Sequence, residues 1–285
     1  MWRAFAIVAL VAVVVIALTR IEALTRLAQR DHVAHLVVDG LIVADPARLE
    51  AIAEVAGNPR AKALIVRIDS PGGTFVGGES LYLALGKVAE KKPVVAVMGT
   101  VATSAAYLVA IAAERVFARQ GSITGSIGVI VQTADISGLL AKLGVKAEAI
   151  KSSPLKATPS PFEPLTDEVR AATQAIIDDM HALFTSIVAK RRGLAAARAR
   201  QLADGRIYSG RQALEADLVD AIGGEAEARS WLAEEKGIAK SLPTHVVEID
   251  RPGADWFPNL TSLAGKMFLS ERLILDGLVS VWHPE

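Results

Sequence analysis

The sequence predicts an α/β fold, in which repeated βαβ units form a largely parallel sheet and a transmembrane helix precedes them. Short, nearly continuous apolar runs alternate with segments whose apolar residues recur at helical spacing, as expected for strands connected by helices. The strand-like runs do not alternate with polar residues, which is typical of strands covered on both faces. The length of 285 residues suffices for one such domain with its own hydrophobic core.

The composition excludes several classes of function. Acidic and basic residues balance at 31 each, so no excess positive charge favours nucleic acid, and we expect no nucleic-acid partner. The chain has no cysteine, which excludes disulfides, a thiolate nucleophile and a cysteine-ligated metal. Among the five histidines, His32 and His35 have possible ligand spacing, but we interpret them as part of a solvated linker. We therefore expect neither a metal nor a cofactor.

Residues 1–20 are predicted to be an uncleaved signal anchor. Residues 4–18 carry no charge, and this length is close to the lower limit of about 17 residues for a span. A cleaved signal peptide is the alternative, but no small-residue cleavage site precedes a polar stretch. Three arginines follow the span within residues 20–30, whereas Arg3 alone precedes it, so the positive-inside rule places the large domain in the cytoplasm.

After a linker at residues 21–32, the α/β domain is predicted to cover residues 33–240. Its strands are expected, in chain order, at residues 36–43, 64–68, 94–98, 127–131 and 147–150. Its helices are expected at residues 47–56, 79–90, 104–113, 136–143 and 166–192, with shorter helices to residue 236. Residues 241–285 are interpreted as a C-terminal extension that packs on the domain, on a neighbouring subunit or on the membrane surface.

Turn and cap residues support this division. Asp45 and Pro46 suit the N-cap and the first position of the first helix. Four prolines between residues 151 and 164 interrupt the strand–helix rhythm and predict an extended loop.

Two loops that follow predicted strands could carry chemistry, because ligands of parallel sheets bind beyond the carboxyl ends of strands. In the first loop, Gly72 and Gly73 allow a sharp turn that exposes backbone N–H groups, although an ordinary tight turn would look the same. In the second, Ser104 is expected near a helix N-terminus, where free N–H groups stabilise developing negative charge. A simple N-cap serine is the alternative, and the surrounding sequence is not a G-x-S-x-G elbow.

The proline-rich loop supplies a possible base. A serine hydroxyl needs a base to become a useful nucleophile, and a lysine amine can serve when burial disfavours its charged form. Lys156 has no neighbouring carboxylate before Glu163, and Lys151 is a rival earlier in the same loop. Either lysine, taken alone, could be an ordinary solvated residue.

Together these segments resemble the signal peptide peptidase A family of membrane-bound serine proteases, which share the ClpP/crotonase-type fold. The similarity covers residues 33–224, most of the folded chain. It rests on ordered segments at compatible spacing, namely residues 70–73, 98–110, 123–129, 150–156, 205–210 and 220–223.

The resemblance implies a Ser–Lys dyad in which Ser104 is the nucleophile and Lys156 is the general base. It implies that Ser126 orients the lysine amine by a hydrogen bond. It assigns the oxyanion hole to the backbone N–H groups of Gly73 and Ala105. It further implies a homo-oligomeric ring in which the serine and the lysine of one active site come from adjacent subunits.

The chain departs from the family pattern in two places. Ala105 and Ala106 stand where two glycines usually follow the nucleophile, and we expect their methyl groups to narrow the cleft. Ala157 stands where an aspartate usually follows the lysine, which bears on the anchoring of the loop rather than on the base.

We therefore expect a serine endopeptidase that cleaves hydrophobic peptides, such as released signal peptides, at the membrane. The resemblance implies a single-pass protein of the inner or plasma membrane with an extracytoplasmic catalytic domain. This conflicts with the orientation that the arginines favour, and the sequence leaves the orientation open.

Three alternatives remain at this point. A tethered scaffold of the same fold could have lost activity, and a crotonase-type acyl-CoA enzyme would need neither Ser104 nor Lys156. A histidine-based triad would have to use His181, which lies inside the long predicted helix without a paired acid in a motif.

Overall fold

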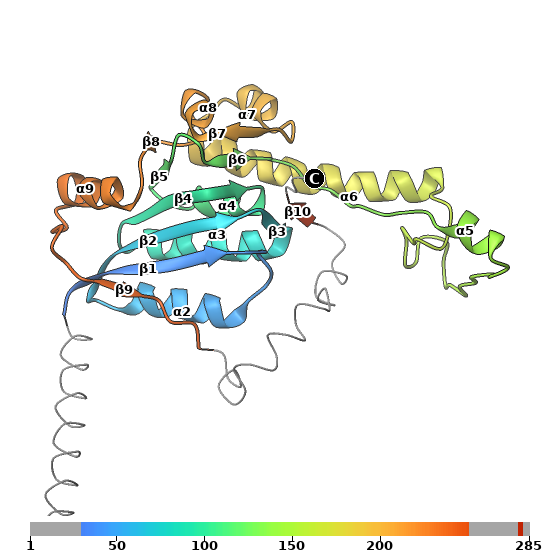
Figure 1. The fold of residues 1–285 in the computed structure, drawn as a ribbon, viewed down its shortest axis with the longest axis horizontal. Helices are drawn as coiled ribbons and strands as arrows, with labels where there is room; N and C mark the ends of the chain where they lie inside the picture. Colours follow the sequence, from blue (N-terminus) through green and yellow to red (C-terminus); the bar gives the residue numbers. More distant parts are fainter. Residues whose placement is uncertain (1–29, 251–278, 282–285) are drawn as a thin grey trace, which may run out of the picture.

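A computed structural model describes residues 30–250 and 279–281 (Figure 1). The predicted anchor at residues 1–20, most of the linker and most of the C-terminal extension lie outside this part of the chain. Within the described part, no helix combines the length and the apolar character that a bilayer span requires.

The centre of the structure is an eight-stranded, mostly parallel sheet with the main order β7-β6-β4-β2-β1-β9, in which β5 pairs with β4 and β8. Its strands are β1 (His32–Asp39), β2 (Ala61–Ser70), β4 (Val94–Thr103), β5 (Arg115–Ala118), β6 (Ile123–Gly125), β7 (Ile207–Ser209), β8 (Ala221–Ile222) and β9 (Thr244–Val246). The pairs β1–β2, β2–β4 and β4–β6 are parallel, whereas β6–β7 is antiparallel. The predicted α/β class with a largely parallel sheet is confirmed.

Helices cover both faces of this sheet. They are α2 (Pro46–Gly57), α3 (Phe75–Ala89), α4 (Ala105–Ala110), α5 (Ser137–Lys142), α6 (Asp167–Arg192), α7 (Ala196–Leu202), α8 (Gly210–Glu215) and α9 (Glu225–Lys236). Leu64 and Val66 of β2 belong to the main core with α2, α3, α4 and α6, whereas Ala63 and Ile65 belong to a smaller core with α9. Because successive residues of a strand face opposite sides, a strand covered on both faces is apolar throughout.

The first strand and the first helix differ in how well the sequence predicts them. Asp45 caps α2 as predicted, and its side chain accepts a hydrogen bond from Arg48 N at 3.2 Å. The interpretation of His32 and His35 as linker residues is wrong, since both lie in β1 and are only 5% and 9% exposed. β9 pairs with β1 here, and the ring of His245 stacks on His32 with centroids 4.1 Å apart.

Two predicted strands are absent from their expected positions in the described chain. Residues 127–131 form an isolated bridge at most, and residues 147–150 form neither strand nor helix. The sheet instead uses the short segments β5 and β6. Every residue from 141 to 150 is exposed, so no strand of the sheet covers residues 147–150.

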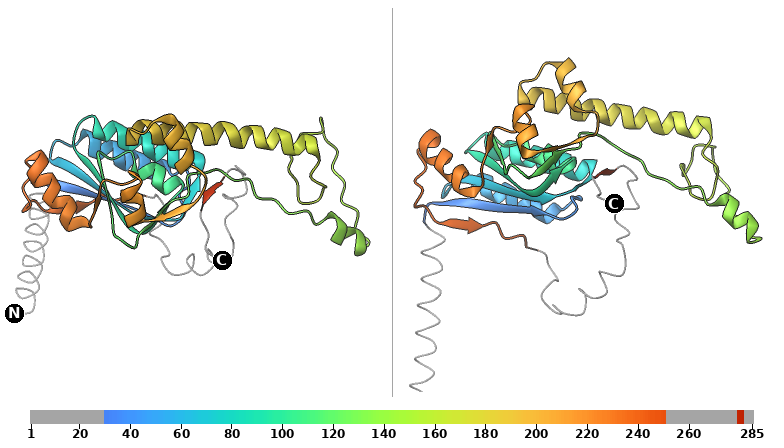
Figure 2. Two further views of the ribbon diagram at one scale, coloured as in Figure 1. Left: turned by 90° about the horizontal axis from the view of Figure 1, so that it is seen from above. Right: turned by 45° about the horizontal axis from the view of Figure 1, so that its top comes forward.

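Residues 131–166, which we call the arm, project away from the sheet together with the N-terminal part of α6. Figures 1 and 2 show α5 and the loop that follows it at the far end of the long helix α6. Every residue of the arm is exposed or half-buried. The predicted proline-rich loop is therefore part of an extension rather than of the compact body.

Candidate active site

Ser104 occupies a sharp turn between β4 and α4. Its backbone has φ +58° and ψ −121°, a conformation that costs a non-glycine residue of order 1–3 kcal/mol. The Ser104 N–H donates to Gly125 O at 2.8 Å, and Leu108 N donates to Ser104 O at 3.0 Å, so β6 and α4 hold the turn from both sides. Strained strand–turn–helix serines of this kind present their hydroxyl groups for nucleophilic attack in other hydrolases.

A cavity of about 380 Å³ opens beside Ser104. Ser126, to which the resemblance assigns the orientation of the lysine amine, lines the same cavity. Its other lining residues are Ile127, Gly128, Val129, Ile130, Gln174, Ile177, Asp178, His181, Ala203, Asp204 and Gly205. A larger cavity of about 560 Å³ contains none of the predicted site residues, so size alone does not identify the site.

His181 lies closer to the nucleophile than its place in a long helix suggested, because it lines the Ser104 cavity. Its Nε2 lies 2.8 Å from Ala203 O, which requires a proton on that nitrogen. Nε2 therefore donates to the backbone and cannot also accept a proton from Ser104.

Gly73, to which the resemblance assigns an oxyanion donor, lies in the strand β3 (Gly72–Thr74). Thr74 N donates to Ile42 O and Ile42 N donates to Gly72 O, both at 2.8 Å. Because backbone polar groups alternate sides along a strand, the N–H and C=O of Gly73 face the edge opposite Ile42. β3 is in contact with α4, which begins at Ala105 and leaves the N–H groups of its first turn without partners inside the helix.

The edge of β3 that carries the Gly73 N–H is paired with the strand β10 (Val279–Val281). The two strands are antiparallel, and Ser280 is the register partner of Gly73. An extended segment of the C-terminal extension thus lies along the strand that was predicted to form the oxyanion hole (Figure 1).

The two methyl groups that were expected to narrow the cleft do not reach it. Ala105 and Ala106 are 1% and 0% exposed. A Cβ added to Gly78 of α3 would lie 2.9 Å from Ala105 Cβ, so the methyl group of Ala105 points towards α3. The change from the family pattern therefore alters the packing behind the nucleophile and leaves the cleft as it is.

The two lysines of the arm differ in their surroundings. Lys151 Nζ forms an ion pair with Glu163 Oε2 at 2.5 Å, and its side chain is 15% exposed. Lys156 is exposed and is absent from the cavity beside Ser104. A single chain thus does not bring Ser104 and Lys156 together.

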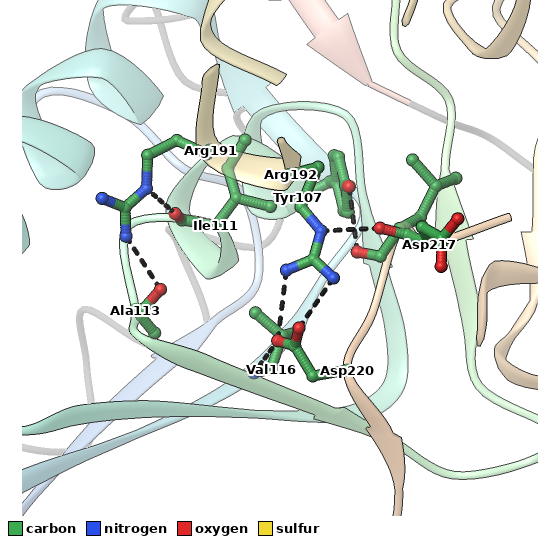
Figure 3. Close-up of polar contacts among 9 residues, drawn as sticks. Tyr107, Ile111, Ala113, Val116, Arg191, Arg192, Asp217 and Asp220 are labelled. Carbon is green, nitrogen blue, oxygen red and sulfur yellow. Dashed lines mark hydrogen bonds and ion pairs between the residues drawn. The ribbon is translucent and has the colours of Figure 1, made fainter. Parts of the chain in front are cut away.

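The next turn of α4 is fixed by a buried polar network that the sequence analysis missed (Figure 3). Tyr107 is fully buried, and its hydroxyl donates to Leu218 O at 3.0 Å; burial raises the pKa of this hydroxyl. Arg192 forms a bidentate pair with Asp220, with distances of 2.8 and 3.1 Å. Burial opposes the charge of Arg192, but its hydrogen bonds to Asp220 prevail and raise the pKa of the guanidinium. In the sequence, the run of cations at residues 190–192 is typical of the C-terminal end of a helix and says nothing of this network.

Comparison with known proteins agrees with this geometry. The model of the peptidase family S49 matches residues 87–239. A Synechocystis sp. protein named as a protease is 40% identical over 86% of this chain and 90% of its own length. The chloroplastic serine protease SPPA of Arabidopsis thaliana is 30% identical over 81% of this chain, which spans 34% of that longer protein.

A solved structure shows the same fold. A point mutant of 1510-N, a membrane-bound stomatin-specific protease, superposes with a TM-score of 0.52 over 78% of this chain and 99% of that one, at 14% identity. At this identity the likeness concerns the fold alone. The family match and the 40% identity are decisive: the chain belongs to peptidase family S49 and is a serine protease.

Proposed function

We propose that this protease hydrolyses peptide bonds with a Ser–Lys dyad, in which Ser104 is the nucleophile and Lys156 the general base. The observation that carries the proposal is the strained turn of Ser104, which lies at the N-terminus of α4 and beside a cavity shared with Ser126. Such a turn persists only where the surrounding structure holds it, and it is concentrated at functional sites.

The chemistry follows from these groups. The Lys156 amine takes the proton of the Ser104 hydroxyl as Oγ attacks the peptide carbonyl carbon. The Gly73 and Ala105 N–H groups stabilise the resulting oxyanion, and Ser126 orients the amine. The intermediate collapses when the lysine gives its proton to the leaving amine, and water then hydrolyses the ester on Ser104 through the same base.

We infer that the lysine reaches the serine from a neighbouring subunit of a homo-oligomer. In the single chain Lys156 is exposed and lies outside the cavity beside Ser104, so it cannot serve the serine of its own chain in this arrangement. Insertion of the arm beside the Ser104 of another copy would bury this amine next to a cavity that has room for it. The arm also exposes large apolar side chains that contact with a second copy would cover: Leu139, Leu143, Val145, Ile150, Leu155 and Phe162.

The substrate we propose is a hydrophobic peptide, such as a released signal peptide, bound at the membrane to which residues 1–20 attach the protein. Ile127, Val129 and Ile177 provide apolar walls beside Ser104. β3 has an edge that an extended chain can occupy, since β10 pairs with it in antiparallel orientation. A peptide substrate would take the position of β10.

The two other sequence-based functions are less well supported. The inactive scaffold was motivated by Ala105 and Ala106, whose methyl groups are buried away from the cleft. The acyl-CoA enzyme was motivated by fold analogy, whereas the chain belongs to a family of peptidases.

The test is turnover of an apolar peptide ester by full-length variants. Ser104→Ala should lower kcat by at least about 10³-fold, and Lys156→Met by about 10²–10⁴-fold. Lys151→Met is the matched control, because its amine is already paired with Glu163 and it should keep activity within about tenfold of the wild type. Full activity of either Ser104→Ala or Lys156→Met would overturn the proposed dyad.

A further inference from the structure

Arg191, the penultimate residue of α6, caps the C-terminal end of the helix that carries Ser104 (Figure 3). Its Nε donates to Ile111 O at 2.6 Å, and one terminal nitrogen donates to Ala112 O at 2.8 Å and to Ala113 O at 2.9 Å. Ile111 is the C-cap residue of α4 and Ala112 and Ala113 follow it, so the guanidinium binds the turn in which α4 ends.

α4 depends on such outside support. It has six residues, too few for a stable helix of its own, and its N-cap Ser104 makes no side-chain capping bond. Ile111, Ala112 and Ala113 are at most 5% exposed in the intact chain, where the Arg191 guanidinium is a hydrogen-bond partner of their carbonyl groups. The Arg191 guanidinium provides hydrogen bonds to these carbonyl groups, and its positive charge stabilises the negative end of the helix dipole.

The support itself is held firmly. α6 has 26 residues, and its Phe184 and Val188 lie in the main core at 0% exposure, one to two turns before Arg191. Core packing of α6 therefore holds the backbone at Arg191, from which the side chain reaches the end of α4.

We propose that Arg191 is a positioning residue for the nucleophile: by holding the C-terminal end of α4 it maintains the strained turn of Ser104 at the opposite end. The proposal rests on the role of Ser104 proposed above. Without Arg191, α4 can shift along its axis, and the Ser104 turn can relax towards an unstrained conformation. A displacement of the nucleophile of about 1 Å is enough to slow the reaction strongly.

A purely structural role for Arg191 predicts something different. It would lower the unfolding temperature but leave the folded molecules with normal reactivity of Ser104. A positioning role changes that reactivity in molecules that remain folded, and it lowers kcat while KM stays nearly constant.

The experiment compares full-length Arg191→Ala, Arg191→Lys and the control Lys190→Ala, which removes an exposed cation from the same last turn of α6. The readouts are kcat and KM on a peptide ester and the rate at which a serine-reactive phosphonate labels Ser104. Arg191→Ala should lower kcat and the labelling rate at least about tenfold with KM within about threefold, and added guanidinium ion should restore part of both. Lys190→Ala should stay within about twofold of the wild type.

Wild-type kcat and labelling in folded Arg191→Ala would overturn the proposal, as would a loss that guanidinium does not restore. If Arg191→Ala does not fold, Arg191→Lys decides the matter, because lysine keeps the charge but lacks the guanidinium fork. Slower labelling at an unchanged unfolding temperature then supports positioning, and wild-type labelling refutes it. Failure of the phosphonate to label Ser104 in the wild type would instead contradict the proposed nucleophile.

Discussion

Replacing Gly73 with alanine probes the proposed oxyanion strand with a single methyl group. A Cβ on Gly73 would lie 1.8 Å from Ile42 O, 2.5 Å from Ile42 C and 2.6 Å from Ile42 N. All three atoms are backbone, so no flexible side chain can move aside. Because real Cβ contacts essentially never fall below 3.0 Å, β3 and Ile42 must separate by about 1.2 Å.

That displacement sets the size of the expected effect. A donor moved by about 1 Å costs about 10²-fold in rate, and complete loss of one oxyanion donor costs about 10²–10³-fold, or about 2.7–4 kcal/mol of barrier. We therefore expect Gly73→Ala to lower kcat by about 10²–10³-fold. The variant should also unfold at a lower temperature, since the bridge between Gly73 and Ile42 is disturbed.

Steady-state kinetics on a peptide ester, together with thermal unfolding, measures both effects. Gly86→Ala is the control, because a Cβ at this position in α3 meets no atom within 4 Å. It should keep wild-type kcat and gain about 0.5–1 kcal/mol in the free energy of unfolding. A folded Gly73→Ala enzyme with wild-type kcat would refute the assignment of the Gly73 N–H to the oxyanion hole.

Further predictions concern the C-terminal strand, the cavity, the buried pair and pH. Ser280→Pro removes the backbone N–H on the register partner of Gly73 and should weaken the pairing of β10 with β3. Because β10 then competes less with the substrate for β3, KM for a peptide should fall by about threefold or more. An unchanged KM would argue against competition. His181→Gln should keep kcat within about fivefold of the wild type, whereas a loss of 10²-fold or more would make His181 the base. Asp220→Ala leaves the guanidinium of Arg192 without its carboxylate and should lower the free energy of unfolding in urea by about 3 kcal/mol; a change below about 1 kcal/mol would contradict this. Burial, and then the charge of His32, lowers the pKa of His245, so the folded chain binds this proton less readily than the unfolded chain. This contribution to stability is complete above about pH 6.5 and falls as the pH drops below it, and His245→Gln should reduce the difference in unfolding temperature between pH 7 and pH 5.

Features that depend on local sequence were predicted well. Asp45, Pro46 and the proline-rich loop act through the conformation of their own backbone, so their effects are visible in the chain order. The alternation of apolar runs with helical segments predicted the parallel sheet for the same reason. Ser104 was placed correctly at a helix N-terminus, although its positive φ was not foreseen, because its N–H is held by Gly125 of β6, which the local sequence around Ser104 does not reveal.

Features that depend on distant partners were not predictable. His32 and His35 are buried because β9, more than two hundred residues later, covers the edge of β1. β5 and β6 are too short for a periodic pattern to appear, and residues 147–150 are exposed and form no strand. The contacts of Arg191 with the end of α4 span about eighty residues, and one sequence offers no signal for such a pairing.

Mixing two inactive variants tests whether the active site is shared between subunits. Ser104→Ala retains Lys156, and Lys156→Met retains Ser104, so neither homo-oligomer contains a complete site. If adjacent subunits contribute the two residues, dissociation and joint reassembly at equal amounts should restore about a quarter of wild-type turnover, since about one pairing in four joins an intact serine to an intact lysine. Turnover that stays at the level of the separate variants, in mixed oligomers shown to have formed, would contradict the shared site.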